Sequence, residues 1–167
     1  MNPGALLIGG VIALALVSRS ASSPAAYDAP AAPPTPAPAG EFVDGWVNGV
    51  QSSIQVADVD EKGHQLRVDA AAAFIAMRAA AAAAGVALVL NSAYRTYAEQ
   101  LRLFNLYLAG EGNLAAPPGH SNHEGGIAVD VESAEGTNAA FHWMTANAAD
   151  YGFRRTVSPE PWHWEFA

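Results

Sequence analysis

The chain contains no cysteine, and this absence narrows the chemistry open to it. Disulfide bonds, thiolate nucleophiles and cysteine-based metal sites are all excluded together. Any metal ion that the chain binds must therefore be held by histidine, aspartate or glutamate side chains.

Basic side chains are also scarce. The sequence has 8 Lys and Arg residues against 16 Asp and Glu residues, which gives a formal net charge of -8. Proteins that bind nucleic acid need clustered lysine and arginine against the phosphates, so we predict no nucleic-acid partner. The length of 167 residues, of which 51% are hydrophobic, predicts one domain with a real core and a short appendage.

Near the N-terminus, residues 5–17 form an apolar run that carries no charge. A membrane-spanning helix needs about 20 apolar residues, so this stretch is typical of the hydrophobic part of a signal peptide. No Lys or Arg precedes it, which leaves an uncleaved membrane anchor or a buried segment of the main fold as alternatives. We expect residues 1–22 to be a signal peptide or membrane anchor, and the protein to be exported to the periplasm or cell envelope.

A linker is predicted over residues 23–40, because residues 24–40 hold six of the 11 prolines and almost no bulky apolar side chain. The remaining residues, 41–167, are predicted to form a compact α+β domain with a small sheet. Apolar side chains in 41–60 are interrupted by Gly and Asp, and we expect irregular structure there. Apolar periodicity predicts helices over 64–84, 97–109 and 138–149 and short strands over 86–90, 126–131 and 162–166.

Residues that can carry chemistry gather at one predicted strand and at the C-terminus. Asp130 stands among apolar residues of the strand, where a buried carboxylate needs a cation, hydrogen-bond donors or a metal. His123 precedes it in a glycine-bordered loop, and His163 lies in the sequence EPWHWE. Two histidines and an aspartate suit zinc, and three protein ligands leave a fourth position for the water of a hydrolytic reaction. Glu160 could take a proton from that water.

Two motifs around these residues resemble those of one family. Residues 121–130, SNHEGGIAVD, match the SxHxxGxAxD pattern of the VanY-like D-alanyl-D-alanine carboxypeptidases, which belong to the LAS metallopeptidases. Residues 160–163, EPWH, match the family's ExWH motif. Residues 92–96, SAYRT, with Gln100 after them, are similar to its SxYR segment, and residues 151–153, YGF, resemble the motif before the last metal ligand.

The resemblance implies an LAS or hedgehog-like α+β fold, with a small and mainly antiparallel sheet flanked by helices. It implies a zinc-dependent hydrolase that acts on peptidoglycan stem peptides and binds one zinc ion per chain. The residues that it assigns are the zinc ligands His123, Asp130 and His163, the general base Glu160, the cation Arg95 at the substrate or oxyanion, and Ser121 in contact with substrate.

The leading substrate is a stem peptide that ends in D-Ala-D-Ala. One alternative is a phage-type L-Ala-D-Glu endopeptidase, serving as an endolysin or a virion-associated lysin. Another is a catalytically silent structural or binding protein on the same fold. Arg95 could instead form an ion pair with Glu99. Glu165 follows His163 by two residues, so in a strand its side chain would point to the same face and could support that ligand. Attachment to a membrane through residues 5–17 stays open.

Overall fold

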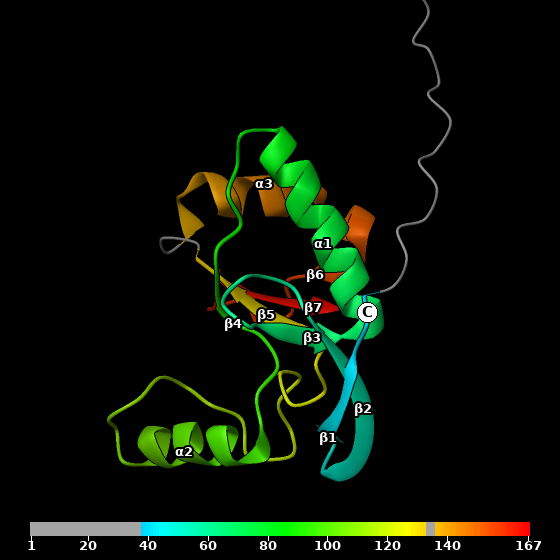
Figure 1. The fold of residues 1–167 in the computed structure, drawn as a ribbon. Helices are drawn as coiled ribbons and strands as arrows, with labels where there is room; N and C mark the ends of the chain where they lie inside the picture. Colours follow the sequence, from blue (N-terminus) through cyan, green and yellow to red (C-terminus); the bar gives the residue numbers. More distant parts are fainter. Residues whose placement is uncertain (1–37, 133–135) are drawn as a thin grey trace, which may run out of the picture. The chain divides into compact units, whose positions relative to one another are not determined.

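The computed structural model describes residues 38–132 and 136–167 (Figure 1). All of them belong to one unit that spans residues 34–167. The predicted signal peptide or anchor and nearly all of the predicted linker lie outside the described residues, so these boundaries stay a prediction. In the described part of the chain, no helix is both long enough and apolar enough to cross a membrane.

Two antiparallel sheets and three α-helices make up this unit as far as it is described, which confirms the α+β class. The first sheet has the strand order β1-β2-β3, and the second has the order β4-β5-β7-β6. The strands are β1 (Glu41–Val47), β2 (Val50–Asp58), β3 (Gln65–Arg67), β4 (Leu90–Ser92), β5 (Ala128–Val131), β6 (Phe153–Arg154) and β7 (His163–Phe166), and the helices are α1 (Val68–Ala83), α2 (Tyr97–Leu108) and α3 (Ala139–Asn147).

The first two strands form a regular hairpin, so the expectation of irregular structure over residues 41–60 was wrong. β1 pairs with β2 in antiparallel register along the whole length of β1. Asn48 and Gly49 join them with φ values of 50 and 80°, the left-handed conformations that a two-residue hairpin turn requires. An Asn-Gly pair between valines predicts this hairpin turn, whereas the spacing of the apolar residues alone does not.

The three predicted helices are confirmed with shifted ends. Residues 65–67, expected in the first helix, form β3 instead because they pair with β2. The strand expected over 86–90 begins only at Leu90, where pairing with β5 begins. β6 was not predicted, since a strand of two residues shows no periodicity and exists only through its partner β7.

Helices α1 and α3 lie on one side of the four-stranded sheet, and α2 lies on the other (Figure 1). The core fills the first side: Val129 and Trp164 point into it from β5 and β7, against Phe74 of α1. The rings of Phe74 and Phe153 meet edge to face, with centroids 5.9 Å apart. Alternate residues of β5 and β7 therefore point to the opposite side, where α2 lies.

Replacing Phe74 with alanine should lower the free energy of unfolding by about 3–5 kcal/mol, because the ring is fully buried and its loss leaves a cavity. Ile75→Ala is the control, since the neighbouring side chain is 36% exposed and should cost clearly less. Urea unfolding measures both. Equal losses in the two variants would contradict this description of the core.

Candidate active site

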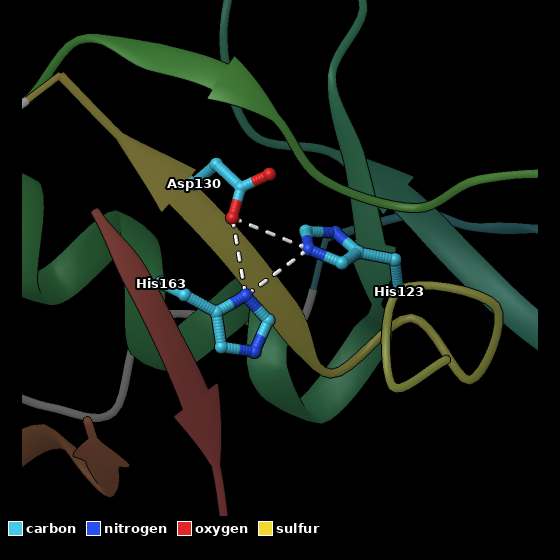
Figure 2. A group of neighbouring side chains, drawn as sticks. All are labelled: His123, Asp130 and His163. Carbon is cyan, nitrogen blue, oxygen red and sulfur yellow. Dashed lines mark hydrogen bonds and ion pairs between the residues drawn. The ribbon is translucent and has the colours of Figure 1, made fainter. Parts of the chain in front are cut away.

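The pairing of β5 with β7 brings the first two predicted ligands together. Asp130 lies directly opposite His163 in the antiparallel register. His123 reaches the same point from the loop before β5, as Figure 2 shows. The distance from Asp130 Oδ1 to His163 Nδ1 is 3.1 Å, and both Asp130 Oδ1 and His163 Nδ1 lie 3.3 Å from His123 Nε2.

This triangle has the size that zinc requires. A tetrahedral zinc ion with bonds of about 2.0–2.1 Å to nitrogen and oxygen holds its ligand atoms about 3.3 Å apart. The three measured edges match that spacing, and the donor set of two imidazoles and one carboxylate is a usual one for zinc. His123, Asp130 and His163 thus could hold one zinc ion and leave a fourth position open.

Hydrogen bonds turn each imidazole so that its free nitrogen faces the other ligands. His123 Nδ1 donates to the carbonyl of Ala93 at 2.7 Å, which leaves Nε2 free. His163 Nε2 donates to Glu165 Oε1 at 2.8 Å, which leaves Nδ1 free. Metal-binding histidines are usually oriented by such an acceptor on the second nitrogen.

The groups around the three ligands shift their pKa values in different directions. Burial lowers the pKa of His123, so this ring is neutral and able to bind a metal. Burial alone would raise the pKa of Asp130, but the neighbouring histidines and Arg95 hold it well below its usual range. Burial would lower the pKa of His163, yet the carboxylates of Asp130 and Glu165 outweigh it and raise that pKa, so a metal competes with a proton for this ring.

Arg95 contacts the second oxygen of the aspartate. Its Nη2 donates to Asp130 Oδ2 at 2.7 Å, its Nε donates to Ser92 Oγ at 2.9 Å, and its Nη1 donates to Gln100 Oε1 at 3.2 Å. The alternative ion pair with Glu99 is not formed, because Glu99 completes the capping box of α2 instead. Arg95 therefore neutralises Asp130 while Oδ1 stays turned toward the histidines.

The loop before β5 is organised by a buried carboxylate to which sequence reasoning assigned no role. Glu124 is fully buried and accepts hydrogen bonds from the N–H groups of Gly119 and Ser121, at 2.9 and 3.1 Å. Ser121 Oγ in turn accepts from the N–H of His123 at 3.3 Å. An acidic residue three positions after a serine, the spacing of a capping box, was the available signal.

The β1–β2 hairpin packs against the same loop. The N–H of Trp46 donates to the carbonyl of Glu124 at 3.1 Å, and the N–H of Gly49 donates to the carbonyl of Gly119 at 2.7 Å. A Cβ added to Gly119 would lie 3.3 Å from the indole of Trp46, so the two segments touch closely. Two backbone hydrogen bonds from the hairpin therefore hold the loop that carries His123.

A cleft of about 890 Å³ opens beside the three ligands and continues along α2 and the loop over residues 111–117. Glu160 lines this cleft, and its carboxylate has no hydrogen-bond partner among the described residues. Arg95 and Ser121 line it too. All six residues predicted from the sequence are thus brought to one cleft, although the role of each is still a prediction.

Comparison with known proteins agrees with this geometry. Residues 63–167 match the family model of VanY, described as D-alanyl-D-alanine carboxypeptidase. The chain belongs to the VanY family.

Relatives of this VanY domain include a curated protein and solved structures. The chain is 31% identical over 122 residues to "Putative carboxypeptidase YodJ" of Bacillus subtilis (strain 168), across 59% of this chain and 45% of that protein, so it spans about half the length of this relative. A variant of the vancomycin resistance D,D-pentapeptidase VanY in complex with Zn(II) is 24% identical with a TM-score of 0.56, covering 68% of this chain and 78% of its own. The LdcB LD-carboxypeptidase is 32% identical with a TM-score of 0.53, covering 61% and 59%.

Membership of the VanY family agrees with the predicted class of metallopeptidase, and the triangle of His123, Asp130 and His163 fits the predicted zinc cofactor. The fold expected from the resemblance is confirmed as well.

The purified VanY-family protein should contain one zinc ion per chain, and Asp130→Ala or His163→Ala should lose it, because each removes one ligand atom of the triangle. Removal of zinc by a chelator should also lower Tm, since bound metal contributes to folding free energy. Elemental analysis and thermal melts measure the two effects. His142→Ala is the control, an exposed histidine of α3 that should leave the zinc content unchanged. A stable His163→Ala protein with full zinc content would refute the assignment.

Proposed function

We propose that this chain hydrolyses peptidoglycan stem peptides and acts as a D-Ala-D-Ala carboxypeptidase. The observation that carries the proposal is the cleft, which is lined both by Glu160, a carboxylate without a hydrogen-bond partner in the described part of the chain, and by the three residues of a metal site with an open fourth position. Membership of a carboxypeptidase family supports the reaction class.

Glu160 is proposed as the general base. Zinc, when bound, would lower the pKa of its water and polarise the scissile carbonyl. The N–H of His163 donates to the carbonyl of Glu160 at 3.2 Å, so a tight turn joins the two residues, and both line the cleft. In that cleft the carboxylate would accept a proton from the attacking water and pass it to the leaving amine.

Arg95 is proposed to bind the terminal carboxylate that distinguishes the substrate of a carboxypeptidase. Apart from the histidines, it is the one basic side chain that lines the cleft in the described part of the chain. A guanidinium has five N–H groups. Its bonds to Ser92, Gln100 and Asp130 use three of them, and Nη2 also lies 3.3 Å from His123 Nε2. The second N–H of Nη1 is available to a carboxylate or to the developing oxyanion. Ser121, on the opposite loop, is proposed to contact the peptide.

The bond that is cleaved separates this proposal from its alternatives. The likeness to LdcB favours, as a second candidate, removal of a single D-alanine from a stem that no longer ends in D-Ala-D-Ala. The phage-type endopeptidase would instead cut between L-Ala and D-Glu, and a silent protein would release nothing. Mass spectrometry of digested muropeptides distinguishes these outcomes, and loss of one D-alanine from stems ending in D-Ala-D-Ala is the result expected.

We also propose that the protein works in the cell envelope, where stem peptides occur, with residues 1–22 as signal peptide or anchor. Fusion of residues 1–40 to a reporter that is active only after export tests this. A reporter retained in the cytoplasm would contradict it.

Glu160→Gln should lower the rate of D-alanine release by about 10²–10⁴-fold, because the amide cannot accept the proton of the water. Zinc content should stay near one per chain, since Glu160 is not among the ligand atoms. Glu132→Gln is the matched control, an exposed glutamate just after β5 that should leave the rate unchanged. Retained turnover in Glu160→Gln would remove Glu160 from its role.

A further inference from the structure

Glu165 is a second glutamate that lines the metal cleft, and its carboxylate is already hydrogen-bonded. It lines the cleft together with Glu160, and its side chain is 15% exposed. Its Oε1 lies 2.8 Å from Nε2 of His163, the ring nitrogen that faces away from the other ligands. A carboxylate in that position is occupied and cannot serve as the base for a water.

The strand geometry explains how Glu165 reaches the ring. His163 and Glu165 are two residues apart in β7, so their side chains point to the same face of the sheet. The residue opposite Glu165 in β5 is Ala128, which has no polar side chain to compete with the ring for the carboxylate. Trp164, between the two, points into the core and fixes which face each neighbour occupies.

Glu165 also lies at the junction of the segments that supply the site. Its side chain forms hydrogen bonds with the side chains of Asn122, His163 and Thr156. Asn122 is the neighbour of the ligand His123 along the chain, and Thr156 belongs to the stretch that leads to the proposed base. One carboxylate thus contacts three separate segments around the metal position.

The two histidine ligands are held differently. His123 donates to a neutral backbone carbonyl of Ala93, whereas His163 donates to a carboxylate. A hydrogen bond to a charged acceptor is roughly twice as strong as one to a neutral acceptor, and it makes the opposite ring nitrogen a better metal donor.

We propose that Glu165 is a positioning residue of the metal site, which holds His163 with Nδ1 toward the ion and strengthens it as a ligand. This inference rests on the metal site of the proposed function and not on its substrate. It can therefore be tested without any peptide, by metal binding alone.

The test is competition for zinc between a chelator and the purified protein, for the wild type, Glu165→Gln and Glu165→Ala. Glu165→Ala should bind zinc about 10–100-fold more weakly, because nothing then orients the ring. Glu165→Gln keeps an oxygen that accepts from Nε2 but not its charge, so its loss should lie between the two. The absorption spectrum of the cobalt-substituted protein should change in the same order, which reports the ligand field directly.

Glu132→Ala is the control and should bind zinc as the wild type does. Unchanged zinc affinity and an unchanged cobalt spectrum in Glu165→Ala would overturn the proposal, and so would an equal loss in Glu132→Ala. Glu165→Gln keeps the volume of the side chain, so it still tests the proposal if Glu165→Ala fails to fold. In that case, a zinc affinity and a cobalt spectrum of Glu165→Gln equal to those of the wild type would overturn the proposal. A protein that binds zinc as predicted but releases no D-alanine would count against the proposed function alone.

Discussion

The register between β5 and β7 is the constraint on which the site depends. It sets Asp130 opposite His163, and a shift of β7 by one residue would turn His163 to the other face of the sheet, away from Asp130. The core prevents that shift, because Val129 and Trp164 fill the interior from the same two strands. The hydrophobic packing on one face therefore fixes the positions of the metal ligands on the other.

Much of the site could be predicted from the sequence, because its ligands occur in two short motifs whose residue types already suit zinc. The α+β fold is confirmed, family membership and the triangle of ligand atoms agree with the predicted zinc metallopeptidase, and the residues assigned to the site meet in one cleft. What sequence reasoning missed depends on contacts between distant segments. Glu124 organises the loop through backbone N–H groups, and such bonds leave little trace in composition.

The errors in secondary structure have the same origin. Residues 65–67 continue a helical pattern, yet pairing with β2 makes them a strand. β6 has only two residues and exists through β7. The hairpin is a different case, since Asn48 and Gly49 encode it locally through their tolerance of positive φ. Local turn chemistry was decisive there, and apolar spacing gave the wrong answer.

The contacts of that hairpin bear on where the functional unit begins. The family match starts at residue 63, but Trp46 and Gly49 hold the ligand-bearing loop by backbone hydrogen bonds from before that point. Backbone N–H and carbonyl groups form such hydrogen bonds whatever the side chains are. These contacts can therefore persist while the sequence of the hairpin diverges. The boundary of the working unit is therefore set by packing around His123, and it lies upstream of the segment that sequence similarity marks.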